Sequence, residues 1–234
     1  IELTDVIRQD LNSGILSYAT TIRKKIESDD FDNINFRINN FKDLIRIENG
    51  EDLMNLLNDS YDNFGIEDTA VIVRSNKRAN IYNKNIRERI LLNENIISVG
   101  DLLMVIKNNY HWLNNKRDLG FIANGDIIKI EEIHSIKKLY GFQFAEVKIT
   151  MVDYPKINSF DTVLILDTLN INTSSMEYSA TTNLYQEILK DYMDIKTKYK
   201  RHLSVKKNKY FNALQVKFAY SFTCHKSQGG QWDS

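Results

Sequence analysis

The chain has 234 residues, enough for one large domain or two small ones, and 42% of them are hydrophobic, which favours a folded globular protein over a disordered one. Its 31 basic and 31 acidic residues give a formal net charge of zero, so any contact with nucleic acid must come from local clusters. A single cysteine, Cys224, excludes a disulfide framework within the chain and fits a cytoplasmic protein, and no apolar stretch reaches the roughly 20 residues that span a membrane.

The first hundred residues alternate between helical and strand patterns. Apolar residues at helical spacing predict helices over residues 15–26, 50–63 and 77–92. The continuous apolar run Thr69–Val73 predicts a parallel strand covered on both faces, and Leu44–Ile47 is a shorter strand candidate. Alternating strands and helices of this length indicate βαβ units and a parallel sheet.

The middle of the chain has short strand patterns separated by turn residues, which is typical of a small antiparallel barrel. The expected strands cover residues 101–107, 126–131, 142–152 and 162–167. A helical pattern then runs from Ser174 to about Arg201, and Lys206, Lys207 and Lys209 follow it in an expected loop.

The last thirty residues return to the character of the first hundred. An apolar strand pattern at Leu214–Phe222 opens into a polar cluster and a glycine pair, which indicates a buried strand followed by a functional loop. We therefore predict a discontinuous parallel-sheet domain from residues 1–100 and 205–234. Residues 101–204 would form a small β-barrel with a helical extension inserted between them.

The closing polar cluster carries a family resemblance. Residues 223–229, Thr-Cys-His-Lys-Ser-Gln-Gly, resemble a motif in the second motor domain of superfamily 1 DNA helicases of the RecD-like and UvrD-like type. The resemblance implies an α/β fold in which a RecA-like parallel sheet, with helices on both faces, is interrupted by a Src-homology-type β-barrel. Segments 4–9, 73–76 and 100–126 resemble further motifs of this family, in the same order. The parent protein would be an ATP-dependent DNA helicase, such as the exodeoxyribonuclease V alpha type.

On the nucleotide side, the resemblance implies a catalytic role for Arg8. A guanidinium can neutralise charge on transferring phosphoryl oxygens, although Arg8 is equally compatible with an ordinary surface position. Gln9, Gln228, Gly229 and Gln231 would approach the nucleotide. Many relatives carry a glutamate at the position of Gln231, so a contact to the ribose would lack that charge here.

On the nucleic-acid side, the resemblance implies contacts with single-stranded DNA by hydroxyl, amide, imidazole, ammonium and aromatic groups. These residues are Ser75, Asn76, Lys107, Asn108, Asn109, Tyr110, Thr223, His225 and Ser227. Simpler interpretations stay open for some of them. Asn76 can start the following helix, and Tyr110 and Trp112 can plug the barrel. Asn124-Gly125 reads mainly as a tight hairpin turn, and Lys226 as one half of a local ion pair.

Two motifs of a complete motor are missing from the sequence. It contains neither the glycine-rich phosphate loop that ends in Gly-Lys-Ser/Thr nor an Asp-Glu pair after an apolar strand. ATP and Mg²⁺ would therefore be bound mainly by a first RecA-like domain upstream of Ile1, in a longer parent chain. No cluster with metal-ligand spacing occurs, so no metal site is expected in this chain.

Two alternatives remain open at this point. The chain could be a non-enzymatic module that binds single-stranded nucleic acid through its barrel. It could also be a structural RecA-like remnant within a nuclease complex. An upstream phosphate loop would favour the motor, and its absence would favour a binding module.

Overall fold

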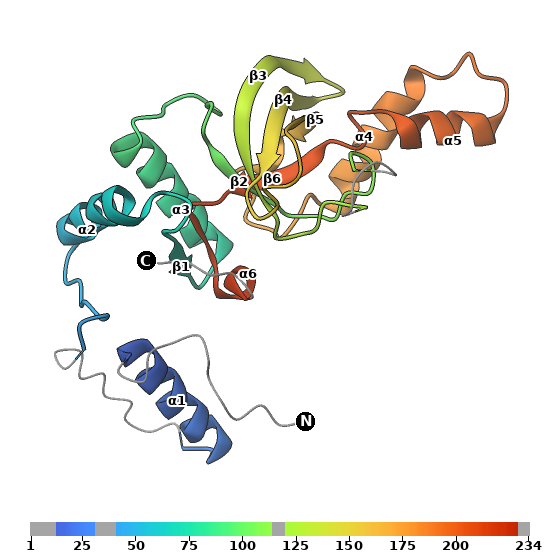
Figure 1. The fold of residues 1–234 in the computed structure, drawn as a ribbon. Helices are drawn as coiled ribbons and strands as arrows, with labels where there is room; N and C mark the ends of the chain where they lie inside the picture. The colour runs from blue at the N-terminus through green and yellow to red at the C-terminus, as the bar shows by residue number, and fades with distance from the viewer. Residues whose placement is uncertain (1–12, 31–40, 114–119, 229–234) are drawn as a thin grey trace. The chain divides into compact units, whose positions relative to one another are not determined.

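The structure is a computed structural model that describes residues 13–30, 41–113 and 120–228. It divides into two compact units, residues 1–57 and 58–234 (Figure 1). The chain has mixed α and β structure, as the sequence predicted. Among the described residues, no helix is both long and apolar enough to cross a membrane.

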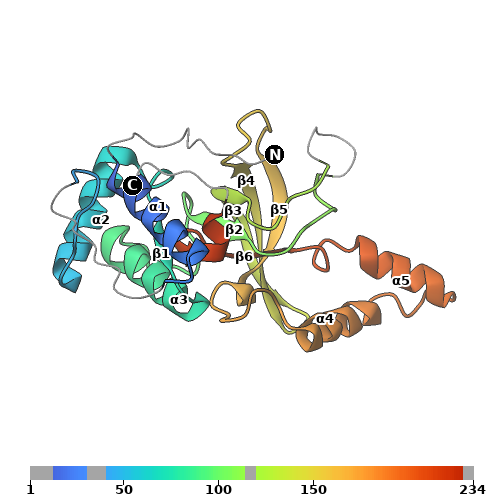
Figure 2. The same ribbon diagram turned by 90° about the horizontal axis from the view of Figure 1, so that it is seen from below.

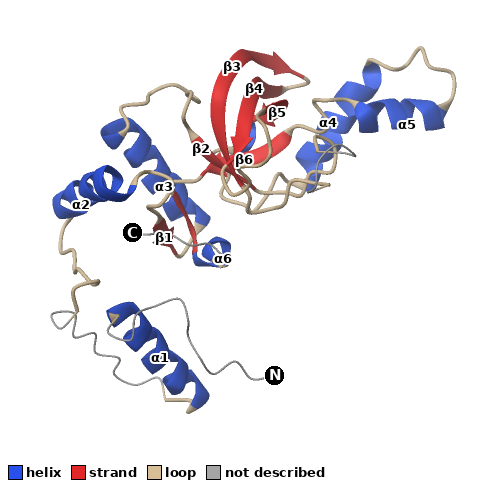
Figure 3. Cartoon of the chain, viewed as in Figure 1, coloured by secondary structure: helices blue, strands red, loops and turns tan. Residues whose placement is uncertain are grey.

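The first unit is built around helix α1, Gly14–Glu27. Ser13 caps this helix, because its hydroxyl accepts a hydrogen bond from Leu16 N at 3.2 Å, and the carboxylate of Asp43 accepts a second bond from Gly14 N at 3.0 Å. A side chain at Gly14 would lie 2.6 Å from the ring of Phe41, so only glycine fits there. The prediction of a strand at Leu44–Ile47 is wrong, because this segment is loop (Figure 3).

Helix α2, Gly50–Phe64, runs across the boundary between the two units. The side-chain oxygen of Asn49 starts it by accepting hydrogen bonds from the backbone N–H groups of Glu51 and Asp52, both at 2.9 Å. Glu51 and Asp52 also place negative charge in the first turn, where the helix dipole favours it.

The second unit begins with a parallel pair of strands. Strand β1, Val71–Val73, pairs with β7, Ser221–Thr223, and Ile72 lies opposite Phe222. After β1 comes α3, Asn76–Asn85, which continues as a π-helical turn, η2, at Ile86–Ile90. After β7 comes the short helix α6, Cys224–Ser227. A parallel strand is thus confirmed within the predicted run Thr69–Val73, but it is not covered on both faces as expected, since Ile72 is 50% exposed. This pair is the only parallel sheet outside the barrel in the described part of the chain.

Five strands form a closed barrel in the order β2-β3-β4-β5-β6 (Figure 1). Their bounds are Leu102–Val105 for β2, Ile127–Leu139 for β3, Phe142–Met151 for β4, Phe160–Ile165 for β5 and Leu214–Phe218 for β6. A 3₁₀ turn, η3, follows β5 at Leu166–Thr168. Side chains with no exposed surface fill the interior, among them Leu103, Val105, Ile128, Ile130, Ile149 and Leu164.

The barrel differs from the expected one in two ways. It is mixed rather than antiparallel, because β6 pairs antiparallel with β2 but parallel with β5. The single strand expected at Leu214–Phe222 is two strands, β6 in the barrel and β7 in the parallel pair, separated by Ala219 and Tyr220. Residues 205–234, assigned from sequence to the parallel-sheet domain, therefore contribute a strand to each sheet.

Two helices separate β5 from β6. Helix α4 spans Tyr178–Lys190 and α5 spans Lys198–Lys207, where the sequence predicted one helix followed by a basic loop. In Figures 1 and 2 the two helices lie on the side of the barrel away from α3. A core of buried side chains joins them to the barrel, comprising Phe144, Val163, Ile165, Leu184, Ile188 and Val205.

The α3–η2 segment is joined to the barrel by buried polar contacts. The Arg87 guanidinium forms two hydrogen bonds with the Asp101 carboxylate, at 3.0 and 2.9 Å, and it lies 4.2 Å from the ring centroid of Phe218. The Tyr220 hydroxyl donates to Asp101 at 2.8 Å. These contacts fix η2 to Phe218, the last residue of β6, and to Tyr220, the residue before β7.

Candidate nucleic-acid interface

A pocket of about 490 Å³ opens where β1 and β7 end side by side. The carboxyl ends of parallel strands are the usual ligand-binding edge of α/β folds. Four residues predicted from sequence line this pocket, namely Ser75, Asn76, Thr223 and His225, together with Lys217 and Lys226. We call it the strand-end pocket.

The backbone around the pocket explains how these side chains are placed. Ser75 is the N-cap of α3, and its hydroxyl accepts a hydrogen bond from Arg78 N at 3.3 Å. Thr223 is the N-cap of α6, but its side chain makes no capping hydrogen bond. The Thr223 hydroxyl is therefore more available to a ligand than the Ser75 hydroxyl. The expectation that Asn76 starts a helix is confirmed, because α3 begins at this residue.

Four basic residues line the strand-end pocket: Arg74 and Lys77, which are exposed, and the less exposed Lys217 and Lys226. Lys217 is 9% exposed, and its ammonium donates to Thr173 O at 2.8 Å. Burial, and the neighbouring Lys226, lower the pKa of Lys217, and burial also lowers the pKa of Lys226. In the described part of the chain no carboxylate pairs with either lysine, so an anionic ligand would supply the missing counter-charge.

The prediction that Lys226 forms a local ion pair is therefore wrong. Its ammonium donates to the side-chain oxygen of Asn124, which lies in the turn between β2 and β3. Asn124-Gly125 does form a tight turn, since Asp126 N bonds to Ala123 O at 3.2 Å and Gly125 has a φ of 111°, but this turn lies at the end of a long β2–β3 connection rather than in a two-residue hairpin. A neutral amide leaves the Lys226 charge uncompensated, which keeps it available for a phosphate.

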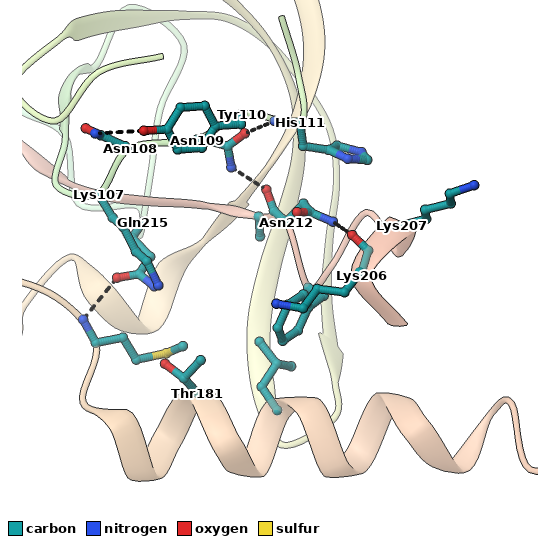
Figure 4. A pocket seen from close by; sticks show the side chains of 14 residues that line it. Lys107, Asn108, Asn109, Tyr110, His111, Thr181, Lys206, Lys207, Asn212 and Gln215 are labelled. Atoms are coloured by element: carbon teal, nitrogen blue, oxygen red, sulfur yellow. Dashed lines mark hydrogen bonds between the residues drawn. The ribbon is translucent and has the colours of Figure 1, made fainter. Parts of the chain in front are cut away.

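A second pocket, of about 520 Å³, lies between the loop after β2 and the two helices α4 and α5 (Figure 4). We call it the barrel-end pocket. All four predicted residues of the loop line it: Lys107, Asn108, Asn109 and Tyr110. The structure thus distributes eight of the predicted nucleic-acid contacts between two pockets.

The four loop residues differ in what they can offer a ligand. Asn109 is occupied within the protein, because its amide donates to Asn212 O at 2.8 Å and its oxygen accepts from His111 N at 2.9 Å. Asn108 accepts from Asn124 N at 2.8 Å. Tyr110 is 62% exposed and is stacked on Phe121, with 5.1 Å between ring centroids. Lys107 and Tyr110 are therefore the ligand-facing members, and the two asparagines order the loop.

Trp112 has a structural role in this loop. Its indole N–H donates to Asn212 O at 2.8 Å, and its ring packs against the core shared by the barrel and the α4–α5 pair. This arrangement favours the interpretation of Trp112 as a barrel plug over base stacking.

Two further predicted residues, Ser227 and Gln228, line neither pocket. The Ser227 hydroxyl donates to Cys224 O at 2.9 Å, so it stabilises α6. Gln228 is exposed at the end of the loop. Arg8, Gln9, Gly229 and Gln231 lie outside the described residues.

Sequence reasoning missed two side chains that shape the strand-end pocket. Lys217 stands between apolar residues of β6, and a charge inside an apolar strand pattern was the available signal. Asn83 is 3% exposed and exchanges hydrogen bonds with the backbone of Ser221 at 2.7 and 2.9 Å. The sequence placed Asn83 only as a helix surface or packing residue, because the backbone of Ser221 that it bonds is 138 residues away.

Comparison with models of known protein families finds no match, and comparison with curated proteins finds none either. Within the described ranges, no three His, Cys, Asp or Glu side chains gather as a metal site would require. Functional inference therefore depends on the two pockets and on the motifs of the sequence.

Proposed function

We propose that this chain is the second RecA-like motor lobe of an ATP-dependent DNA helicase and that it holds single-stranded DNA in the strand-end pocket. The supporting observation is that Ser75, Asn76, Thr223 and His225, which come from distant motifs, meet at the ends of two parallel strands. Arg74, Lys77, Lys217 and Lys226 add positive charge, and none of them pairs with a carboxylate in the described part of the chain. Hydroxyl, imidazole and ammonium groups are suitable donors to backbone phosphates.

The sheet and barrel fit this proposal as parts of a larger arrangement. The structure has a parallel pair, β1–β7, with a helix after each strand. Under this proposal the pair would be two neighbouring strands of a RecA-like sheet. The closed barrel would be the Src-homology-type insertion. ATP and Mg²⁺ would be held mainly by a first RecA-like domain, and Arg8, Gln9 and the closing loop would approach the nucleotide from this lobe.

The closing loop offers a route for coupling DNA to nucleotide. Thr223 and His225 line the strand-end pocket, whereas Gln228 lies at the exposed far end of the same short segment. A strand that moves α6 would also move Gln228, because four residues of helix connect them. Coupling of this kind is a free energy between two sites that share one moving element.

A second function is favoured by one specific observation. The largest sheet of the described chain is the closed barrel, which has a basic pocket of its own at one end. A non-enzymatic module that binds single-stranded nucleic acid would need no more than this. The two functions differ in whether Gln228 affects ATP turnover.

The experiment compares two substitutions in the parent helicase. His225→Ala should weaken binding of a labelled oligothymidine about tenfold and reduce DNA-stimulated ATP hydrolysis at limiting DNA, with basal turnover little changed. Gln228→Ala should leave DNA affinity within about twofold but reduce stimulation at saturating DNA. Lys156→Ala, an exposed lysine outside both pockets, is the control. A parent without DNA-stimulated hydrolysis, or a Gln228→Ala variant with normal stimulation, would overturn the motor proposal.

A further inference from the structure

Positive charge in this chain is concentrated in one segment that the proposed function does not use. Residues 196–209 contain seven lysines and arginines and no aspartate or glutamate. The other residues carry 24 basic and 31 acidic side chains, so the rest of the chain has a net charge of −7. A neutral protein thus has one strongly basic surface, which includes all of α5.

Five of the seven basic side chains are available for a partner. Lys209 pairs with Glu146 at 2.8 Å, and the half-buried Arg201 donates to Ile195 O. The other five are exposed, and no carboxylate among the described residues lies within ion-pair distance of them. They are Lys196, Lys198, Lys200, Lys206 and Lys207, and we call them the α5 basic face.

Helix periodicity explains why these lysines face outward. Arg201, Ser204, Val205 and Asn208, at helical spacing, are the less exposed residues on the side that faces the protein, and Val205 has no exposed surface. The opposite arc carries the lysines, together with Tyr199, which is 68% exposed. The buried side of α5 packs in the core of this protein, and its outer arc carries Tyr199 and Leu203 among the lysines, a smaller apolar surface than the full apolar face with which a helix enters a bilayer.

The basic face continues into the barrel-end pocket. Lys206 and Lys207 line one wall of that pocket, and Lys107, from the loop after β2, lines another (Figure 4). At its base Gln215 is only 6% exposed, and its side-chain oxygen accepts from Met176 N at 3.0 Å. Its amide nitrogen has no hydrogen-bond partner in the described part of the chain and is free to donate to a ligand.

These features fit the chemistry of a nucleic-acid strand. From Lys198 to Lys207 the lysines extend about 14 Å along the helix axis, roughly the length of four nucleotides on one strand of a duplex. The pocket volume of about 520 Å³ is within the ordinary range for small-ligand sites. The exposed ring of Tyr110 at its edge offers a stacking surface.

We infer that the α5 basic face binds the sugar–phosphate backbone of a nucleic acid and leads one strand into the barrel-end pocket. This contact lies outside the strand-end pocket, and the α5 basic face is part of neither proposed function, although the pocket it leads into is the one on which the second function rests. A motor with this second contact would hold nucleic acid in two pockets that are lined by neighbouring residues, Gln215 and Lys217 of β6 and Ile106 and Lys107 after β2.

The test compares two variants with the same change in net charge. In the first, Lys198, Lys200, Lys206 and Lys207 are all replaced by glutamine. In the control, four other exposed lysines, Lys24, Lys42, Lys138 and Lys156, are replaced by glutamine. Anisotropy with a labelled 30-nucleotide strand, a 30-base-pair duplex and a fork between 50 and 200 mM salt gives affinities and salt slopes.

We expect the first variant to bind at least tenfold more weakly than the control and to lose two or more units of salt slope, because each backbone contact contributes a little under one unit. Arginine at the same four positions should restore binding. Equal affinity of the two glutamine variants for all three probes would overturn the inference. So would loss of binding to phosphatidylserine vesicles without loss of nucleic-acid binding, which would indicate a membrane surface.

A measurement on the unmodified chain makes the test independent of the variants. Acetylation of lysines, followed by mass spectrometry, should show protection of the α5 basic face when the oligonucleotide is present. This protection should persist in the His225→Ala variant, so failure of the strand-end pocket and failure of this inference give different results. Protection at Lys217 and Lys226 but at no lysine of α5 would overturn the inference.

Discussion

Asp101 is the residue whose environment most constrains the second unit. It has no exposed surface and accepts hydrogen bonds from Arg87, Tyr220 and the backbone of Ser98. A buried carboxylate is tolerated because every one of these donors compensates for the lost hydration. The site joins η2, the start of β2 and the segment between β6 and β7, so three distant parts of the chain depend on a single charge.

Replacing Asp101 by asparagine should lower the free energy of unfolding by about 3–5 kcal/mol, because Arg87 would remain buried without its counter-charge. Urea denaturation measures this change. Glu88→Gln removes the exposed partner of Lys84, 3.8 Å away, and should cost less than about 0.5 kcal/mol. Equal effects of the two substitutions would contradict the assigned role of Asp101.

Glu146 gives a second prediction at this scale, which concerns pH. Hydrogen bonds from Lys209 and Tyr210 lower the pKa of Glu146 from its ordinary 4.5 to about 2. Stability from the ionised carboxylate is therefore complete above about pH 4.5 and is lost as the pH falls through about 2. Glu146→Gln should cost about 1 kcal/mol at pH 7, since solvent screens this partly exposed group.

The comparison of wild type and Glu146→Gln by urea denaturation at pH 7, 5 and 3 checks this sign. The difference between the two proteins should be the same at pH 7 and 5 and smaller at pH 3. A difference that stays constant over the whole range would show that the ionised form of Glu146 is not the stabilising one.

Among the elements, the β6–β7 segment links the two sheets. Only Ala219 and Tyr220 separate the strands, and Asn83 bonds to the backbone on both sides, at Phe218 O and at Ser221. The strand-end pocket is therefore held to the barrel by a two-residue connection and by the Asn83 side chain, which bonds to the backbone on both sides of it. Movement of the barrel relative to α3 would change the shape of the pocket.

Asn83→Ala should destabilise this junction by about 2 kcal/mol, because the N–H of Ser221 would be buried without a partner. Hydrogen exchange should then accelerate at the amides of 221–223 more than in β3 and β4. Asn85→Ala removes one exposed hydrogen bond, to Ile81 O at 2.9 Å, and serves as the control. Uniform acceleration throughout the barrel would instead indicate global unfolding.

The elements also show what the sequence could and could not predict. Helices α1 and α2 and strands β1 and β4 were predicted close to their observed bounds, because their apolar periodicity is local. The division of 214–222 into two strands was not predictable, since a continuous apolar run does not show which sheet each residue joins. The pockets show the same limit. Residues of the sequence motifs were predicted to contact a ligand, whereas the roles of Lys217 and Asn83 could not be predicted because their partners lie far along the chain.

At the scale of the whole molecule, the missing phosphate loop determines one expected outcome. The 234-residue chain should hydrolyse ATP no faster than buffer alone, with or without single-stranded DNA, because no phosphate-cradling loop or Mg²⁺-binding carboxylate pair occurs in its sequence. Release of inorganic phosphate measures this. ATP turnover above about one per minute that persists after further purification of the chain would show that the catalytic groups lie within it.

The register of β6 and β7 has a consequence for how the protein is made. Leu103 pairs with Phe218, and Val71 pairs with Ser221, so the barrel and the parallel pair are both completed by the last strands of the described chain. During synthesis β1 and one edge of β2 remain without their partner strands until residues 214–223 leave the ribosome. The unpaired edges expose the growing chain to misassociation. A nascent chain that stalls before residue 214 should therefore depend on chaperones, whereas one that has passed residue 223 should become protease-resistant in both sheets at once.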